Sequence, residues 1–412
     1  MKAVVFTLGC KVNECESDSL IQGLLDYGYE VTDKLETADI YIINSCAVTK
    51  DAEKKSRQAV ARALSLNPKA KVILTGCASQ KAPKDFISKK GVSVVTGTFG
   101  KQNILTLLSS SGEFIYSEPS KYEELPLPKT LRTRTYVKVQ DGCNNFCSYC
   151  VIPYLRGRER SRDYQSIINE INEIKPKEAV INGINLSAYN YEGKGLQGLI
   201  CALKPVETRI RLGSLEARVV TKELLEALKQ LKNFAPHFHL SLQSGSDAVL
   251  KSMNRHYSTS SYLEKVNLIK SYFPSAGITT DVIVGFPTET EENFLESVEF
   301  IRKVGFSDIH PFRFSPREGT VAFKMKDLGA RVKKERIEVL LNLKKELKEN
   351  FISSQIGTVQ EFLKEEFKQG YTVGYTGNYL RVYVKGEVNF ENLVKVKIIE
   401  KLNDGAVAEI LN

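Results

Sequence analysis

The sequence predicts an α/β protein with three domains: an N-terminal doubly wound α/β domain, a central partial TIM-like barrel of six β/α units, and a small C-terminal antiparallel β-barrel. Three observations predict this fold class. Short apolar runs alternate with helical periods over about the first 120 residues, a second βα series follows, and the tail alternates β-branched and charged residues around glycine-containing turns. We expect domains at residues 1–120, 132–350 and 351–412, with a linker at 121–131.

Four β-rich runs are the expected strands of the first domain: AVVFTLGC, DIYIINSC, KVILTGC and VSVVTG. Helical periods such as SDSLIQGLLDYG and KKSRQAVARALSL separate them, and this alternation is typical of a parallel, doubly wound sheet. The next stretch, SEPSKYEELPLPKT, holds three prolines and few large apolar residues. It is therefore expected to be a linker.

Six strand candidates follow the linker: TYVKVQDG, EAVINGIN, RIRLGSL, HFHLSLQS, TTDVIVGF and DIHPFRF. Helical patterns lie between them, which indicates a partial TIM-like barrel with its site at the carboxyl ends of the strands. An amphipathic helix is expected from Val332 to about Phe351. The tail, which includes GYTVGYTGNYLRVYVKGEV, has the pattern of a small antiparallel barrel.

Composition limits the class of protein. The chain has 412 residues, of which 42% are hydrophobic, and this is ample for packed cores. No apolar run approaches the ~18 residues that a membrane span needs, and the first run is too short for a secretory signal. We expect a cytoplasmic protein without a membrane partner, whose eight cysteines are metal ligands, catalytic groups or core residues rather than disulfides. The net charge of +9 is compatible with a nucleic-acid partner.

The stretch DGCNNFCSYC brings Cys143, Cys147 and Cys150 close together. An iron–sulfur cubane is usually held by four thiolates, so three cysteines leave one iron with an open position for a small molecule. Zinc is the main competitor, but no histidine or fourth cysteine nearby completes a tetrahedron, and the nearest downstream histidine is His237. We favour the iron–sulfur cluster, on this spacing together with the resemblance described below.

A second set of cysteines is phased with the predicted strands. Cys10, Cys46 and Cys77 each directly follow an apolar strand, about one βα unit apart. Because parallel strands bring their carboxyl ends to one edge of the sheet, the three thiols are expected to converge there and hold a second cluster. The alternative is three small buried cysteines in the core. Cys15 and Cys201 do not follow strands and are expected in helix or packing roles, with Cys15 a rival ligand.

The spacing CxxxCxxC after a first barrel strand resembles the signature of the radical S-adenosylmethionine superfamily. With TLGCKVNECES, INSCAVT, LSLQSGSDAVLKSMNRHY, DVIVGFPTETEENF and FSPREGT, the whole chain resembles the methylthiotransferases, and its C-terminal barrel resembles their TRAM domain. Within that family, the segment around the first cysteine differs between branches. Here it is GCKVN, with Lys11, Val12 and Asn13, and it resembles the segment of the enzymes that act on N6-threonylcarbamoyladenosine of tRNA. GCQMN resembles the isopentenyladenosine branch, and GCPKN the ribosomal-protein branch.

The resemblance implies two [4Fe–4S] clusters, one on each cysteine trio, and S-adenosylmethionine, which the open iron of the Cys143 cluster would chelate and cleave to a radical. It implies a transferase that converts N6-threonylcarbamoyladenosine at position 37, in the tRNA anticodon stem-loop, to its 2-methylthio derivative, with an electron donor such as flavodoxin or ferredoxin. The six cysteines would be its catalytic residues. The alternatives are methylthiolation of N6-isopentenyladenosine or of a ribosomal protein, and a non-enzymatic RNA-binding protein with two zinc sites.

Glycines and polar residues at strand ends are candidates for binding the cofactor. The resemblance puts Gly183 and Asn185 near the methionine amino group, and Gly285 and Phe286 near the adenine; ordinary strand-end turns are the alternative for the two glycines. Polar side chains at other strand ends suit hydrogen bonds to a ribose or a carboxylate. The polar candidates are Glu216, Ser241 and Gln243. Tyr149, the aromatic residue directly before Cys150, is a further candidate.

Two segments are candidates for binding RNA. YLRGRERSR has alternating arginines, which in extended structure share one face and suit phosphate or the cofactor carboxylate; the alternative is a solvated face paired with its own acidic residues. The tail offers tyrosines and cations on strands, suited to stacking and phosphate contact. The candidates are Arg156, Arg158, Arg160, Arg162, Tyr375, Tyr379, Arg381 and Lys385. The four histidines, His237, His239, His256 and His310, are expected to be packing residues.

Overall fold

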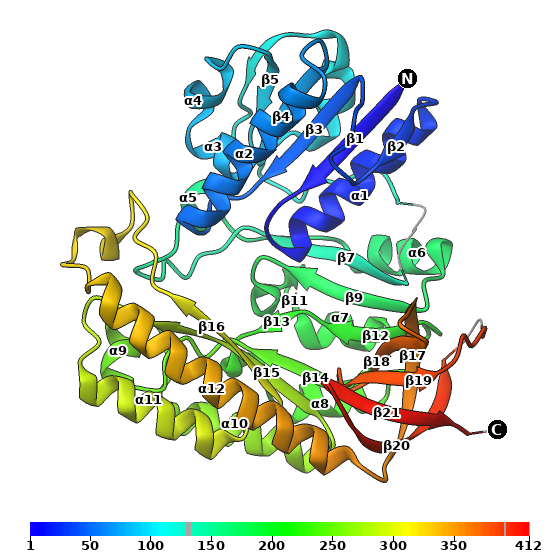
Figure 1. Cartoon of the computed structure of the whole chain (residues 1–412), viewed down its shortest axis with the longest axis vertical. Helices are drawn as coiled ribbons and strands as arrows, with labels where there is room; N and C mark the ends of the chain where they lie inside the picture. The colour runs from blue at the N-terminus through cyan, green and yellow to red at the C-terminus, as the bar shows by residue number, and fades with distance from the viewer. Residues whose placement is uncertain (129–132, 391–392, 412) are drawn as a thin grey trace.

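The structure, a computed structural model, describes residues 1–128, 133–390 and 393–411. Three units follow one another along the chain, with the N-terminal domain in blue above the central barrel and the C-terminal barrel in red beside it (Figure 1). The last three residues of the predicted linker 121–131, and residue 132, where the central domain is predicted to begin, lie outside the described residues, as does residue 412. In the described residues, no helix is long and apolar enough to cross a membrane.

The N-terminal sheet has the order β2-β1-β3-β4-β5-β6, and all of its pairings are parallel. Its strands are β1 (Lys2–Thr7), β2 (Glu30–Thr32), β3 (Ile40–Ser45), β4 (Lys71–Gly76), β5 (Val92–Thr96) and β6 (Gly112–Phe114). The four predicted strands are present, and two short edge strands, β2 and β6, are additional. The strand order reverses between β1 and β3, which is where open α/β sheets bind ligands at the carboxyl ends of the strands.

Helices cover both faces of this sheet. They are α1 (Lys11–Asp26), α2 (Lys50–Leu66), α3 (Cys77–Lys81), α4 (Pro83–Ile87) and the 3-10 helix η1 (Lys101–Ser109). Two separate apolar cores result, because neighbouring residues of a strand point to opposite faces. Val5 packs with Leu20 of α1 on one face, and Val4 packs with Val60 of α2 on the other. The doubly wound fold predicted for this domain is therefore confirmed.

Gly76 ends β4 with a backbone that only glycine adopts easily, and Cys77 follows it. Its φ is 97°, and a Cβ there would lie 2.5 Å from the carbonyl oxygen of Ser45. We expect Gly76→Ala to lower the free energy of unfolding by about 2–5 kcal/mol, from left-handed strain plus overlap. Gly28, with a φ of 81° and no atom within 4 Å of its would-be Cβ, is the matched control. Gly28→Ala should cost about 1–2 kcal/mol from strain alone.

Chemical denaturation of the two variants checks this prediction. Gly76→Ala is expected to lose more free energy of unfolding than Gly28→Ala. It should also contain less iron, because Cys77 is displaced. Equal losses for the two glycines would mean that the close approach to Ser45 has no energetic effect.

The central domain is a half-open barrel made of two sheets, β12-β9-β7-β8 and β13-β14-β15-β16. Their pairings are parallel except that of β7 with the short edge strand β8, and the two sheets meet at a bridge between Ile210 and Phe234. The strands are β7 (Arg134–Asp141), β8 (Arg160–Ser161), β9 (Glu178–Gly183), β12 (Arg209–Leu212), β13 (Ser214–Leu215), β14 (His237–Leu240), β15 (Gly277–Val284) and β16 (Asp308–Arg313). All six predicted strands are present. Within the described residues β7 and β16 are not paired, so the barrel stays open there, as predicted for a partial TIM-like fold.

Helices surround the two sheets of this domain (Figure 1). Those that bury apolar residues in the barrel core are α6 (Tyr164–Ile174), α7 (Leu196–Ala202), α8 (Lys222–Lys229), α10 (Thr259–Tyr272), α11 (Glu291–Val304) and α12 (Ala330–Gln355). The short helix α5 (Ile152–Leu155) packs Leu155 into the core of the N-terminal domain, and α9 (Asp247–Ser252) packs Val249 into a separate cluster with Phe286. Short elements complete the domain: η2 (Leu186–Ala188), β10 (Asn190–Tyr191), β11 (Lys194–Gly195), η3 (Ala217–Val219) and η4 (Val321–Lys324). Helix α12 turns Leu340, Leu343 and Leu347 into the core and runs past the predicted domain boundary at residue 350.

The C-terminal domain is a closed barrel in the order β17-β18-β19-β21-β20. Its strands are β17 (Val359–Lys368), β18 (Tyr371–Thr376), β19 (Arg381–Lys385), β20 (Val394–Leu402) and β21 (Gly405–Ile410). The predicted small barrel is confirmed, although the pairing of β19 with β21 is parallel. That pair is parallel because the chain crosses the barrel from β19 to β20 and returns through the β20–β21 hairpin.

The described part of the linker is packed between the first two domains. The Tyr122 hydroxyl donates a hydrogen bond to the Lys138 carbonyl oxygen at 2.8 Å. A carboxylate oxygen of Glu123 accepts from the amide of Gly100 at 2.9 Å, and Glu124 pairs with Arg162 at 2.8 Å. These contacts tie the linker to both neighbours.

Candidate functional site

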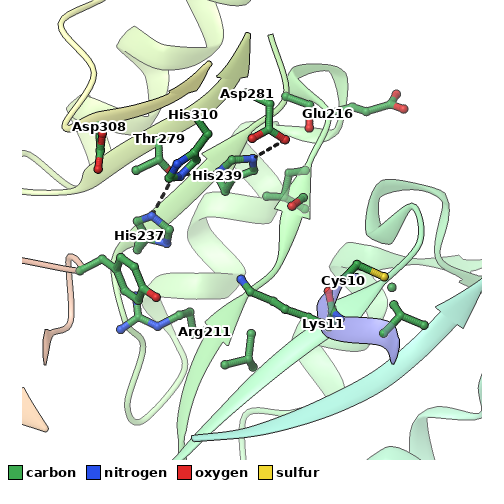
Figure 2. Close-up of a pocket in the computed structure, with 18 of the residues that line it drawn as sticks. Cys10, Lys11, Arg211, Glu216, His237, His239, Thr279, Asp281, Asp308 and His310 are labelled. Atoms are coloured by element: carbon green, nitrogen blue, oxygen red, sulfur yellow. Dashed lines mark hydrogen bonds and ion pairs between the residues drawn. The ribbon is translucent and has the colours of Figure 1, made fainter. Parts of the chain in front are cut away.

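A cavity of about 830 Å³ lies where the three domains meet. The N-terminal domain contributes Cys10 and Lys11, the central barrel contributes the Cys143 loop and the ends of its strands, and the C-terminal barrel contributes Tyr375 and Tyr379. Figure 2 shows side chains from the central barrel facing Cys10 and Lys11 across this space. The carboxyl ends of the barrel strands thus face the edge of the N-terminal sheet that carries Cys10.

Each sulfur of the Cys143 loop receives a hydrogen bond from a nitrogen. Arg255 Nη1 donates to Cys147 Sγ at 3.3 Å, and the amide of Ile152 donates to Cys150 Sγ at 3.5 Å. Asn185 Nδ2 donates to Cys143 Sγ at 3.8 Å. Such donors stabilise thiolates that ligate a metal centre.

Burial makes two of these thiols, those of Cys143 and Cys150, poor acids in the protein alone. Desolvation raises the pKa of Cys143, and it raises the pKa of Cys150 to about 12. Both groups are therefore protonated at neutral pH unless a metal centre supplies positive charge and displaces the protons. The sulfur donors and their hydrogen bonds fit an iron–sulfur cluster.

Cys10, Cys46 and Cys77 lie at one edge of the N-terminal sheet. Cys10 caps α1, Cys46 follows β3, and Cys77 begins α3. A Cβ built on Gly9 would lie 3.0 Å from Cys46 Sγ, so the loop that carries Cys10 touches Cys46. Burial, and then the charges of Cys77 and Cys10, raise the pKa of Cys46 to about 11. The three thiols are thus near neighbours, and their binding of a cluster stays a prediction.

The remaining cysteines lie elsewhere. Cys15 is buried on α1, where desolvation and the charge of Glu170 raise its pKa, and it does not line the cavity. Cys201 is half-buried on α7. In the described part of the chain, no three His, Cys, Asp or Glu side chains are arranged to hold a single metal ion.

A buried charge network joins the N-terminal domain to the barrel. Its two carboxylates and three cations are Glu16, Asp141, Lys101, Lys138 and Arg156. Arg156 Nη1 lies 2.9 Å from Glu16 Oε1 and 3.1 Å from Asp141 Oδ1. Burial alone would raise the pKa of Glu16, but the charges of Arg156, Lys101 and Lys138 hold it well below its usual range.

This network reaches the sheet edge that carries the cysteines. Arg156 Nη2 donates to Asn13 Oδ1 at 2.6 Å, and the amide nitrogen of Asn13 donates to the carbonyl oxygens of Leu8 and Ser45. Burial raises the pKa of Cys77, and Arg156 opposes that rise through its charge and a hydrogen bond. The buried guanidinium is therefore an electrostatic partner of this cysteine.

The prediction that four alternating arginines share an exposed RNA-binding face is wrong for three of them. Arg156 is only 1% exposed and lies in the buried network. Arg160 and Arg162 are also buried, and pair with Glu118 and with Glu124 and Glu170. Arg158 is exposed and lies over the ring of Phe146. The physical reason is that carboxylates from other segments pair with these arginines: Glu16 of α1 with Arg156, and Glu118 and Glu124, which precede β7, with Arg160 and Arg162.

Most of the predicted cofactor residues line the cavity. These are Tyr149, Gly183, Asn185, Glu216, Ser241 and Gln243. Gln243 has a φ of 68° and bridges β15 by accepting from the Ile283 amide at 2.8 Å. Gly285 and Phe286 are not among the described lining residues. Phe286 is fully buried and packs edge-on against Tyr149, with 6.5 Å between ring centroids, so it supports the wall from behind.

Three histidines expected to be packing residues line the cavity instead. The Thr279 hydroxyl lies 3.0 Å from His237 Nε2 and 2.9 Å from His239 Nδ1. His239 also pairs with Asp281 at 3.3 Å and stacks on His310 (Figure 2). The available signal was the HFH pattern in β14, whose period of two turns both histidines into the barrel.

The C-terminal barrel inserts aromatic side chains into the same wall. Tyr379 stacks on His237, with 4.8 Å between centroids, and on Tyr375, with 4.7 Å. Arg381 lines the cavity and pairs with Asp404 at 3.1 Å, whereas Lys385 is exposed outside it. Burial, followed by the charges of Arg211 and His239, holds the pKa of His237 well below its usual range, so this ring is neutral.

Comparison with known proteins matches two family models, described as "Uncharacterized protein family UPF0004" over residues 2–97 and "Radical SAM superfamily" over residues 137–301. The chain is 38% identical over 386 residues to Threonylcarbamoyladenosine tRNA methylthiotransferase MtaB of Bacillus subtilis, covering 89% of this chain and 85% of that protein. It is 39% identical over 376 residues to the protein of the same name from Aquifex aeolicus, with 87% and 91% covered. The chain belongs to the radical SAM methylthiotransferase family.

More distant similarity agrees with this family. The chain is 36% identical over 386 residues to tRNA-2-methylthio-N(6)-dimethylallyladenosine synthase of Bacillus velezensis, covering 88% of this chain and 76% of that protein. The solved structure of the radical S-adenosylmethionine methyltransferase TsrM from Kitasatospora setae, with cobalamin and [4Fe-4S] cluster bound, has the same fold at a TM-score of 0.54 and 12% identity, covering 76% of this chain and 75% of that one.

Membership of the radical SAM methylthiotransferases confirms the predicted transferase activity, and the predicted cofactors, S-adenosylmethionine and [4Fe–4S] clusters. The three thiols of the Cys143 loop, each with a nitrogen donor, fit one such cluster.

Proposed function

We propose that this enzyme transfers a methylthio group to C2 of N6-threonylcarbamoyladenosine at position 37 of tRNA. The observation that carries the proposal is the shared cavity, in which Cys10 and the Cys143 loop line one space. An aromatic C2–H is neither acidic nor electrophilic, so its replacement needs a radical, and a radical must meet its sulfur within a short distance. Two relatives that are 38% and 39% identical to the chain are named for this nucleoside.

The residues of this chain bind and shield the reactants. We assign one cluster to Cys143, Cys147 and Cys150, where with S-adenosylmethionine it supplies the radical, and another to Cys10, Cys46 and Cys77, where it supplies the sulfur. The walls contributed by three domains exclude water from the radical. Asn185, Glu216, Ser241 and Gln243 offer polar atoms to S-adenosylmethionine.

The RNA side of the cavity belongs to the C-terminal barrel. Tyr375 and Tyr379 suit stacking contacts with RNA bases at the rim, and exposed Arg158 and Lys385 suit phosphate contact. We propose the tRNA anticodon stem-loop as the partner, together with an electron donor such as flavodoxin or ferredoxin. A cytoplasmic location follows from these partners.

Mass spectrometry of tRNA nucleosides from cells that lack the gene tests the acceptor. The expected result is loss of 2-methylthio-N6-threonylcarbamoyladenosine and accumulation of its precursor, restored by the wild-type gene but not by Cys46→Ala. If that nucleoside persists while the 2-methylthio derivative of isopentenyladenosine disappears, the assigned nucleoside is wrong.

A further inference from the structure

Lys11 is a cation in the cavity without a counter-ion. It is the first residue of α1, directly after Cys10, and its side chain extends into the cavity toward the side that holds Arg211 and His237 (Figure 2). In the described part of the chain, no hydrogen bond or ion pair of its ammonium group is found. Its side chain is exposed to the solvent of the cavity, so the charge is hydrated until a ligand displaces the water, and that ligand must then neutralise it.

The groups around Lys11 increase the local positive charge. Arg134 lies near it and pairs with Glu365 at 2.5 Å. Arg211 also lies near it, and pairs with Glu178 at 2.6 Å. Glu178 also pairs with Arg209 at 2.7 Å, so this carboxylate is shared by two guanidinium groups. This end of the cavity therefore attracts an anion.

The arginines are held rigidly, whereas Lys11 is free to bind. Arg211 donates hydrogen bonds to the carbonyl oxygens of Gly377 and Thr376 as well as to Glu178. The guanidinium groups of Arg134 and Arg211 lie 5.2 and 4.9 Å from the centroid of the Tyr379 ring. Their donors are largely committed to protein acceptors, so of these three cations Lys11 is the one best able to bind a ligand.

Asp281 is an acidic neighbour of Lys11, and it is already paired with His239 at 3.3 Å. A bound carboxylate would pair with the ammonium and offset the nearby positive charges of Arg134 and Arg211, whereas an apolar group would displace water from the ammonium and leave its charge unpaired.

We propose that Lys11 binds the carboxylate of the threonyl group on N6 of the substrate adenine, and that this ion pair selects such a base over adenines with an apolar N6 group. The inference rests on the proposed function and deepens it. Lys11 directly follows Cys10, so a base anchored by its N6 substituent at Lys11 lies in the cavity that both cysteine sets border. An adenine with an apolar N6 group is rejected, because that group would remove water from the ammonium of Lys11 without supplying a negative charge to pair with it.

The test uses the reconstituted holoenzyme and two anticodon stem-loops that differ only at one group. One carries the threonylcarbamoyl carboxylate, and the other carries its methyl ester, which removes the charge and keeps the shape and every phosphate. The variants are Lys11→Met and Lys34→Met, since Lys34 is exposed in the N-terminal domain and outside the cavity. Binding is measured by fluorescence anisotropy of labelled RNA, and turnover by the methylthiolated product.

Wild type and Lys34→Met should prefer the acid to the ester by about 10- to 100-fold, the usual effect of a hydrogen bond to a charged group. Lys11→Met should lose this preference by binding the acid more weakly, with ester binding unchanged. An equal loss for both RNAs would assign Lys11 to a phosphate, and a loss only in S-adenosylmethionine affinity would assign it to the cofactor; either result overturns the inference.

Turnover by the wild-type enzyme distinguishes the proposed nucleoside from the proposed contact between Lys11 and its carboxylate. If it methylthiolates acid and ester RNAs equally well, the carboxylate contact is absent although the proposed function stands. If it modifies neither RNA but modifies a stem-loop with isopentenyladenosine, the proposed nucleoside is itself wrong, and the ion pair with it.

Discussion

Cys147→Ala is expected to abolish cleavage of S-adenosylmethionine, whereas Cys46→Ala should leave cleavage measurable and stop sulfur insertion. Cys147 lies in the loop whose sulfurs line the cavity beside Asn185 and Gln243, and Arg255 donates to it. Cys46 is buried at the edge of the other domain. Because the two sets of thiols belong to separate domains, loss of one set should leave the other intact.

The measurements are 5′-deoxyadenosine for cleavage, the methylthio nucleoside for insertion, and iron per chain. Wild-type protein prepared without oxygen should be brown and hold about eight irons, and each variant about four, as expected for two four-iron clusters. Cys201→Ala, on the outer helix α7, is the matched control and should behave as wild type. Equal loss of both activities in the two variants would argue against separate roles, and colourless protein containing zinc would indicate a non-enzymatic metalloprotein.

The fold was predictable from local periodicity. The buried runs that precede Cys10, Cys46 and Cys77 became β1, β3 and β4, because parallel strands covered on both faces are nearly continuously apolar. Because each of these cysteines directly follows a parallel strand, all three lie at the same edge of the sheet. The edge strands β2 and β6 were missed because three residues carry too little pattern.

The arginine-rich segment shows where sequence reasoning failed. Arg158, Arg160 and Arg162 alternate as a surface strand would, and nothing local reveals that Glu118 and Glu124, some forty residues upstream, cover them. A tertiary contact decided the outcome. The unexpected burial of Arg156 has the same cause, since its partner Glu16 comes from another domain.

The positions of His237, His239 and His310 in the cavity wall were missed for a related reason. His237 and His239 follow a strand period that fits a core as well as a cavity wall, and only the arrival of Tyr379 from the C-terminal barrel distinguishes the two. A site assembled from three domains leaves no short motif. Side chains with strongly shifted pKa values, such as His237, mark it once the structure is known.

Arg156→Met should lower the free energy of unfolding by about 3–5 kcal/mol, the usual loss when one partner is removed from a buried ion pair. The methionine fills a similar volume, but Glu16, which is 0% exposed, then keeps only Lys101 and Lys138 of its three cationic partners. Arg158→Met is the matched control two positions along, where the side chain is exposed, and should cost about 0–1 kcal/mol. Denaturant unfolding of both proteins provides the comparison.

The pH dependence distinguishes a charge effect from a packing effect. The pKa of Glu16 in the fold lies well below its usual value of 4.5, so its ionised form stabilises the fold above about that pH, and this contribution is lost as the pH falls through the folded pKa. Without Arg156 the folded pKa rises, and protonation then relieves the unpaired charge. The gap in stability between Arg156→Met and wild type should therefore narrow as the pH falls from 7 toward 4. A gap that stays constant over that range would mean that Arg156 stabilises the domain interface through its packing and not through its charge.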